Sequence, residues 1–169
     1  MSTIKGINSL DDLKRLPGAA ALLGEVIRES RTTRGKPTLV ESSVEIVAGA
    51  FVAMIPVATV SEINQRSWRS RSKRTDAAWR AVSRTIGPHI IMLGPVAAAY
   101  HAGRTLEVDF TRLGGRQLDA SNLPTSTKAV EDALCWMIGA DDADPRWEPR
   151  WYQMPGGVCG VRVEIRVQA

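Results

Sequence analysis

The chain has 169 residues, 44% of them hydrophobic and 24% charged, which is typical of one globular domain and excludes a fibrous or wholly disordered protein. Its net charge of +4 fits a protein that binds polyanions, although many proteins of this charge bind none. The apolar stretches 44–60 and 90–100 are interrupted by charged, glycine or proline residues and are too short for a membrane span.

The cysteine and histidine residues offer no metal-binding pattern. Cys135 and Cys159 form no Cys-x-x-Cys pair, and with His89 and His101 they make no recognisable zinc-ligand spacing. We interpret both cysteines as reduced core thiols of a cytosolic protein. The segment 1–16 also lacks the apolar region of a secretory signal peptide.

The N-terminal segment, residues 1–37, differs in character from the rest of the chain. In its first helix-like stretch Ser9 is a candidate N-cap, and Asp11 and Asp12 occupy the first turn, where acidic side chains favour the helix dipole. A second short stretch with apolar spacing and the linker-like sequence RTTRGKP follow. We therefore expect an N-terminal helical extension and linker over 1–37, followed by one domain over 38–169.

The first half of this domain alternates between apolar and basic segments. Residues 38–60 are rich in valine, isoleucine and alanine and predict one or two strands, with Gly49 at a bulge. A polar, basic segment follows, and a helix is predicted from Thr75 onward, with this threonine as its N-cap. Residues 88–103 predict a second helix that is bent or stopped near Pro95.

The second half contains two strands and a helix. Residues 104–113 alternate and predict a strand. Its apolar face holds Leu106, Val108 and Phe110, and its polar face holds Glu107, Asp109 and Thr111. Residues 128–138 have a helical period, and 161–167 alternate again as the last strand. The sequence therefore predicts an α+β fold, a mixed or antiparallel sheet with two or more helices packed on it.

The predicted helix over 128–138 has two distinct sides. Its apolar stripe consists of Val130, Ala133, Leu134, Met137 and Ile138. The other side carries Lys128, Glu131, Asp132 and Cys135.

Acidic residues flank this helix at both ends. Asp119 follows a strand and a glycine-rich turn, and Asp141, Asp142 and Asp144 follow the end of the helix. Hydrolysis of a phosphodiester needs hard oxygen ligands for Mg²⁺ or Mn²⁺, and a nearby lysine can stabilise charge on the phosphate. Lys128 is the only basic residue between Asp119 and Asp144.

The same residues also fit an ordinary surface helix with turns at its ends. Aspartate is a good turn former, and Lys128 and Asp132 have the i,i+4 spacing of a surface ion pair. Because a helix of about 15 residues is about 22 Å long, its two flanking loops meet only if they converge across the sheet. Spacing alone therefore leaves both a metal site and plain turns open.

A basic cluster precedes the helix predicted from Thr75 onward and continues into it, with Asp76 as the only acid inside the cluster. Its seven members are Arg66, Arg69, Arg71, Lys73, Arg74, Arg80 and Arg84. Such a cluster gives salt-sensitive, sequence-independent affinity for DNA, and we expect the five members from Arg66 to Arg74 to contact nucleic acid. A solvated helix face is the alternative. Trp68 either stacks on an unpaired base or anchors the start of the helix.

The remaining four tryptophans have different expected places. Trp79 shares a helical face with Val82 and Ile86 and is expected in the core. Trp136 falls beside the apolar stripe, where a subunit interface could use it. Trp147 and Trp151 follow the segment of Asp141, Asp142 and Asp144, which we call the acidic loop. They either line a site or cover the sheet edge.

The pattern LDxxNL…KAVEDAL…GxDDxDPRW resembles the RusA-type Holliday junction resolvases, especially their phage-borne relatives. The resemblance covers about residues 45–167 and is strongest from Leu118 to Arg146. It implies a RusA-like fold and metal-dependent cleavage of branched DNA by a homodimer, with Mg²⁺ or Mn²⁺ as cofactor. It also implies residence in the cytoplasm of a bacterial host cell.

Family roles carry over by position. Asp119 matches the first metal-binding aspartate, and Asn122 matches the asparagine that closes this motif. Lys128 matches the catalytic lysine, with about three additional residues before it. Asp142 matches the remaining metal-binding aspartate, and Asp141 is its neighbour. The resemblance thus implies catalytic roles for Asp119, Lys128 and Asp142, and a metal site on Asp119, Asp142 and Asp141.

One position departs from the family pattern, because Ser121 stands where a second carboxylate is expected. The serine could hold a metal-bound water while Asp141 or Asp144 supplies the lost charge. Alternatively, the protein binds branched DNA with weakened catalysis. A third alternative is a phage structural or interaction protein, in which the acidic loop is only a turn.

Overall fold

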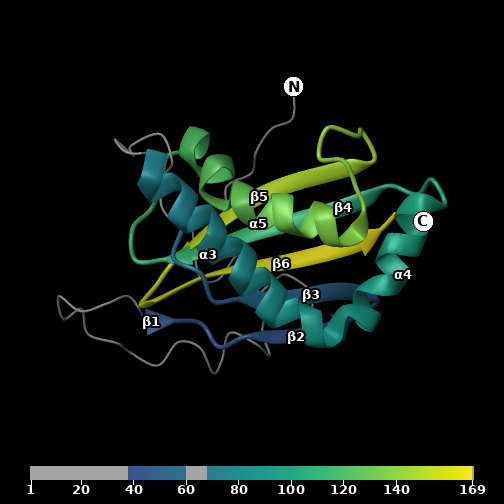
Figure 1. Ribbon diagram of the computed structural model, residues 1–169, viewed down its shortest axis with the longest axis horizontal. Helices are drawn as coiled ribbons and strands as arrows, with labels where there is room; N and C mark the ends of the chain where they lie inside the picture. The colour runs from purple at the N-terminus through teal and green to yellow at the C-terminus, as the bar shows by residue number, and fades with distance from the viewer. Residues whose placement is uncertain (1–37, 60–67, 169) are drawn as a thin grey trace.

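The computed structural model describes residues 38–59 and 68–168, which form an α+β fold (Figure 1). The extension predicted over 1–37, with its Ser9 cap, lies outside the described residues. In chain order the elements are β1 (Thr38–Leu39), β2 (Ser43–Val47), β3 (Ala50–Ile55), α3 (Trp68–Ile86), the 3₁₀ turn η1 (Gly87–His89), α4 (Ile90–His101), β4 (Leu106–Gly114), the 3₁₀ turn η2 (Ala120–Asn122), α5 (Leu123–Ile138), β5 (Trp147–Pro155) and β6 (Val158–Val167).

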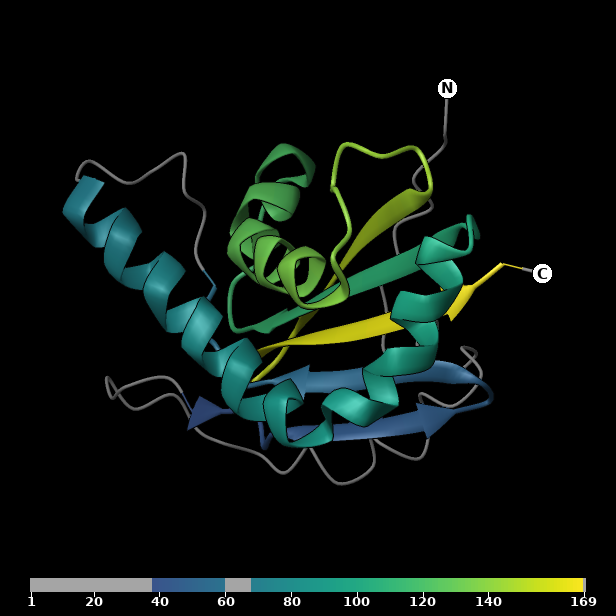
Figure 2. The same cartoon turned by 45° about the vertical axis from the view of Figure 1, so that its right-hand side comes forward.

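The six strands form one mixed sheet that is not closed into a barrel. Its main order is β2-β3-β6-β4-β5, and the short β1 pairs in parallel with the start of β6. β4 and β5 are parallel neighbours because α5 crosses over between them, whereas β6 is antiparallel to both β3 and β4. All three described helices lie on one face of the sheet (Figure 2). This confirms the predicted fold class.

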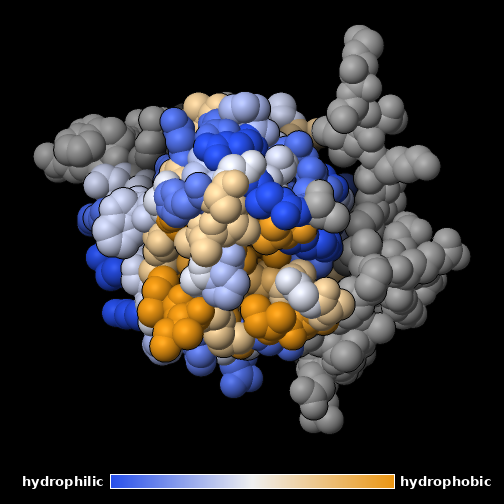
Figure 3. Space-filling view, turned by 90° about the vertical axis from the view of Figure 1, so that its right-hand side faces the viewer, coloured by the Kyte–Doolittle hydropathy of each residue, from blue (hydrophilic) through white to orange (hydrophobic). Residues whose placement is uncertain are grey.

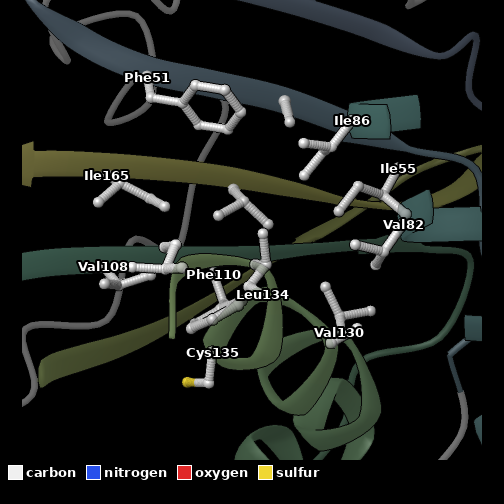
Figure 4. Packing of buried hydrophobic residues seen from close by; sticks show 14 of the residues in the cluster. Phe51, Ile55, Val82, Ile86, Val108, Phe110, Val130, Leu134, Cys135 and Ile165 are labelled. Carbon is white, nitrogen blue, oxygen red and sulfur yellow. The ribbon is translucent and has the colours of Figure 1, made fainter. Parts of the chain in front are cut away.

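The core lies between this face and the helices (Figure 4). The predicted alternation of β4 is confirmed, since Leu106, Val108 and Phe110 are fully buried there. They pack with Phe51, Ile55, Val82, Ile86, Val130, Leu134, Val163 and Ile165. Each such side chain contributes roughly 1.5–3 kcal/mol through burial. No helix among the described residues is long and apolar enough to cross a bilayer.

The opposite face of the sheet carries paired charges. Asp109, which is 8% exposed, accepts hydrogen bonds from Arg150 at 2.6 Å and Arg166 at 2.8 Å. Glu164, also buried, pairs with Arg162 and Arg166. These pairs explain how the polar face predicted for β4 can be buried without leaving its charge unpaired.

Several predicted boundaries were wrong. α3 begins at Trp68, so Thr75 lies inside the helix and does not cap it, since the arginines and lysine before it are themselves good helix formers. α5 begins at Leu123, five residues earlier than expected, with a proline in its first turn, where proline fits a helix well. Pro95 lies within α4, which continues to His101.

Gly49 forms a hairpin turn and not a bulge. Ala48 and Gly49 have φ values of 50° and 81°, and Val47 pairs directly with Ala50. Two residues with positive φ between paired strands form the turn that matches strand twist.

The periodicity of the sequence did not predict the strand β5 (Trp147–Pro155). Pro149 lies within it, and proline argues against a central strand because it lacks an N–H donor. β5 is the edge strand beside β4, where a missing donor on the outer side is tolerated.

Candidate active site

The ammonium of Lys128 lies among three carboxylates. Its Nζ is 3.2 Å from Glu131 Oε2 and 3.1 Å from Asp132 Oδ1, both on α5, and it also contacts Asp142 Oδ2 in the loop after the helix. We call these four residues the Lys128 cluster. The loop that follows α5 therefore folds back along the helix and brings together Lys128 and Asp142, to both of which the family resemblance gives catalytic roles.

The opposite charges of the cluster shift the pKa values of Lys128 and Asp142 in favour of their charged forms. Burial opposes the charged form of Lys128, but the hydrogen bonds to Asp142 and Asp132 and the charge of Glu131 outweigh it and raise the pKa of Lys128. The hydrogen bond from Lys128 and its positive charge in turn lower the pKa of Asp142. Lys128 is therefore protonated at neutral pH and supplies positive charge, not a proton-accepting amine.

Glu131 supports the cluster from the protein interior. It is only 3% exposed, and its Oε1 accepts a hydrogen bond from Trp147 Nε1 at 3.0 Å. Trp147, at the start of β5, is itself buried, so it lies beneath the cluster and ties β5 to α5. Sequence reasoning missed both roles. The side of α5 that carries Lys128 is thus partly buried, and Cys135 is buried there too, where burial and the nearby Glu131 raise the pKa of its thiol to about 12.

The acidic loop is attached to the end of α4. Tyr100 Oη donates to Asp144 Oδ2 at 2.9 Å and accepts from the Asp141 N–H at 3.3 Å. Arg146 pairs with Asp144 and lies 4.6 Å from the centre of the Tyr100 ring. Its hydrogen bonds hold the pKa of Asp144 well below the usual range. Asp144 therefore anchors the loop through Tyr100 and Arg146. Nothing in the sequence indicated that these two residues would be its partners.

The C-terminal end of α5 is also fixed. His101 Nε2 lies 2.9 Å from the carbonyl oxygen of Ile138. Gly139 ends the helix with a φ of 72°, and a Cβ at this position would lie 3.2 Å from the His101 ring. The turn that sends the acidic loop back along α5 is therefore set by a glycine in the left-handed region.

Asp119 precedes α5, whereas the acidic loop of Asp141, Asp142 and Asp144 follows it. Asp119 is exposed at the start of η2, and its carbonyl oxygen accepts the Asn122 N–H at 2.9 Å. No hydrogen bond or ion pair joins its carboxylate to Lys128, Asp141 or Asp142, all of which are described residues. Ser121 is exposed beside it.

Within 38–59 and 68–168, no group of three histidine, cysteine or acidic side chains is arranged as a metal site. The metal site on Asp119, Asp141 and Asp142 stays a prediction. The donors themselves are carboxylate oxygens, which suit Mg²⁺ or Mn²⁺. Three carboxylates around one ammonium give the Lys128 cluster a net charge of −2.

The predicted basic cluster lies largely on α3. Arg66 lies outside the described residues, and Arg69, Arg71, Lys73 and Arg74 fall in the first two turns of the helix. Lys73 and Arg74 are exposed. Figure 2 shows this end of α3 extending past the end of the sheet.

Trp79, Trp136 and Trp151 differ in burial, while the side chain of Trp68 lies outside the described part of the structure. Trp79 is partly buried against the core, as predicted, and its ring centre is 5.8 Å from that of Trp136. Trp136 is 71% exposed. Trp151, on the edge strand β5, packs against the core. Both cysteines are free thiols, Cys135 buried and Cys159 partly so.

No protein-family model matches this chain, and no curated protein matches it either. The likeness to RusA-type resolvases therefore rests on the motif residues of the sequence alone.

Proposed function

We propose that this protein is a metal-dependent endonuclease that cleaves branched DNA, such as a four-way junction, by phosphodiester hydrolysis in the cytoplasm of a bacterial host cell. The observation that carries the proposal is the contact between Lys128 and Asp142. These residues are 14 positions apart, and the family pattern gives both of them catalytic roles.

In this proposal Asp119 and Asp142, with Asp141 beside them, hold Mg²⁺ or Mn²⁺. The bound ion would supply Lewis acidity toward the scissile phosphate. Their oxygen donors and the excess negative charge of the Lys128 cluster fit a hard divalent cation.

Lys128 has the second role, which is to stabilise charge on the phosphate in the transition state. Its raised pKa keeps it protonated. Glu131, fixed by Trp147, orients the ammonium from the buried side, while the Lys128 side chain keeps 40% of its surface exposed. The ammonium is thus both held and accessible to a substrate.

In the same proposal, basic side chains of the protein bind the phosphate backbone of the DNA. The exposed basic residues of α3, including Lys73 and Arg74, provide sequence-independent affinity for phosphates. Such binding suits an enzyme that recognises the shape of a junction and not its sequence.

A homodimer is part of the proposal, because paired cuts across a nearly two-fold junction need two equivalent sites. Exposed apolar side chains are available for association. Figure 3 shows apolar surface on the side formed by α4, where Ile91 is 87% and Ile90 is 44% exposed. Light scattering that finds a monomer at tens of micromolar would count against resolution of junctions, though not against DNA binding.

The deciding experiment incubates the protein with a synthetic four-way junction in Mg²⁺, Mn²⁺ or chelator. Metal-dependent nicking that is lost in Asp142→Asn and Lys128→Ala supports the proposal. Glu148→Gln is the matched control, since this exposed acid on β5 accepts a hydrogen bond from Gln168 and is not a member of the Lys128 cluster. If both site variants cleave at the wild-type rate, the Lys128 cluster is not the active site.

Two other outcomes point to the alternative functions. A gel shift without nicking identifies a branched-DNA-binding protein that Ser121 has weakened as an enzyme. Neither binding nor cleavage favours a phage structural or interaction protein.

A further inference from the structure

Two neighbouring side chains reach the short segment that leads to Asp119. Arg112 on β4 and Gln153 on β5 are register partners, two pairs before the end of the parallel ladder. Arg112 Nη1 donates to the carbonyl oxygen of Arg116 at 2.7 Å. Gln153 contacts Leu118, the residue immediately before Asp119.

The Gln153 amide holds Leu118 by two backbone hydrogen bonds. Its Oε1 accepts the Leu118 N–H at 2.8 Å, and its Nε2 donates to the Leu118 carbonyl oxygen at 2.7 Å. A primary amide can satisfy a peptide unit in this way because it carries both a donor and an acceptor. The Gln153 side chain therefore pairs with the backbone of Leu118 as a neighbouring strand would, although Leu118 belongs to no strand.

Arg112 is an unusual group to find buried. It is 6% exposed, its Nε is buried without a hydrogen-bond partner, and no carboxylate of the described residues pairs with its guanidinium. An unpaired buried charge is destabilising, so a neutral side chain would be preferred here if only packing mattered. The guanidinium donates instead to two backbone carbonyl oxygens, to Arg116 at 2.7 Å and, at the longer distance of 3.5 Å, to Thr59.

Gly114 makes room for this arginine. A Cβ on Gly114 would lie 2.8 Å from Arg112 Nη2 and 3.1 Å from Arg112 Cζ. The next residue, Gly115, has only an ordinary 3.6 Å neighbour, the carbonyl oxygen of Gly156. The two adjacent glycines therefore differ in their relation to Arg112.

We propose that Arg112 and Gln153 are positioning residues that fix the Arg116–Leu118 segment and thereby orient Asp119 as a metal ligand. This inference rests on the proposed function, in which Asp119 binds the ion. Asp119 is exposed and makes no side-chain contact with the Lys128 cluster, so the backbone before it decides where its carboxylate lies. Productive ligand geometry requires placement within roughly 0.5 Å, which a loop held at only one end does not provide.

Two variants test the clamp without altering Asp119. Gln153→Met keeps length and removes both hydrogen bonds, with Gln168→Met as control, because the Gln168 amide pairs with Glu107 and Glu148 instead. Gly114→Ala crowds the guanidinium, with Gly115→Ala as its control. Neither glycine has a positive φ, so the alanines are compatible with the backbone.

Two readouts are independent of cleavage. In hydrogen exchange, Gln153→Met should lower the protection of the Leu118 amide roughly five- to tenfold, as expected for one lost hydrogen bond. In NMR titrations, both clamp variants should need severalfold more Mn²⁺ to broaden the Asp119 amide signal, while the control variants match the wild type.

The same variants should raise the Mn²⁺ concentration for half-maximal cleavage severalfold, leave junction affinity unchanged, and recover activity in excess Mn²⁺. An unchanged Leu118 amide, or an Asp119 signal that broadens at the wild-type Mn²⁺ concentration in both variants, would overturn the proposal. So would a wild-type Asp119 amide that Mn²⁺ does not broaden at all. Lack of cleavage by a wild type that still shows the two amide effects would refute only the nuclease function.

Discussion

Removal of the Lys128 ammonium is expected to destabilise the fold, because a buried carboxylate depends on it. Lys128→Met keeps most of the stem and leaves Glu131, whose side chain is 4% exposed, with Trp147 as its remaining partner. Loss of one partner from a fully buried ion pair costs about 3–5 kcal/mol. Because the Lys128 side chain is 40% exposed, solvent screens the pair, and we expect about 1–2 kcal/mol.

This effect should disappear when Glu131 is also neutral. In Lys128→Met/Glu131→Gln, the amide oxygen can still accept the Trp147 N–H and needs no cation. We therefore expect the double variant to recover most of the loss. Urea unfolding gives the coupling energy, and the midpoint of thermal unfolding should fall by about 2–8 °C in the single variant.

The matched control is the cycle of Lys128→Met with Asp132→Asn. This i,i+4 pair has 40% and 42% of its side-chain surfaces exposed, and such pairs are worth about 0.3–0.5 kcal/mol. Coupling to Glu131 should therefore exceed coupling to Asp132. Equal coupling energies would refute the reasoning, since Glu131 would then gain nothing from its burial beneath the cluster.

Three further predictions concern other parts of the molecule. Ser121→Asp should raise the initial rate of Mg²⁺-dependent cleavage severalfold if the serine is a handicap; a loss of rate would show that Ser121 has its own role. Lys128 lowers the pKa of Asp142, and Arg146 lowers that of Asp144. Both ion pairs therefore stabilise the folded state at neutral pH, and this stabilisation is lost as pH falls below the usual carboxylate range. Asp142→Asn should accordingly lose less thermal stability than the wild type between about pH 5 and pH 2. The last of the three concerns four basic residues of α3, Arg69, Arg71, Lys73 and Arg74. Their replacement by alanine should reduce the slope of log affinity for DNA against log salt concentration by up to about 3–4, and an unchanged slope would exclude them from the DNA footprint.

Much of the fold could be predicted because its burial follows simple periodicities. The alternation from Leu106 to Phe110 and the stripe beginning at Val130 both face the core as expected. β5 escaped prediction because Pro149 interrupts its strand pattern, and only its edge position makes that proline acceptable.

The missed strand also explains what was missed at the site. The pattern of α5 separates an apolar stripe from a polar side, but it cannot show that Trp147 of β5 covers part of the polar side. Glu131 therefore looked like a surface acid, and its burial depends on a partner 16 residues away. Likewise, Gln153 carries no sequence signal for Leu118, because the contact exists only once β4 and β5 are paired.

The charge of the Lys128 cluster leads to a final prediction about DNA binding. Three carboxylates against one ammonium give a net charge of −2, and Asp142→Asn reduces it to −1. Since like charges repel a DNA phosphate, this variant should bind a four-way junction more tightly than the wild type in chelator, while it fails to cleave in Mg²⁺. Lys128→Ala makes the cluster more negative and should weaken binding. Gel shifts in chelator test this order of affinities, and equal binding by all three proteins would place the cluster outside the DNA footprint.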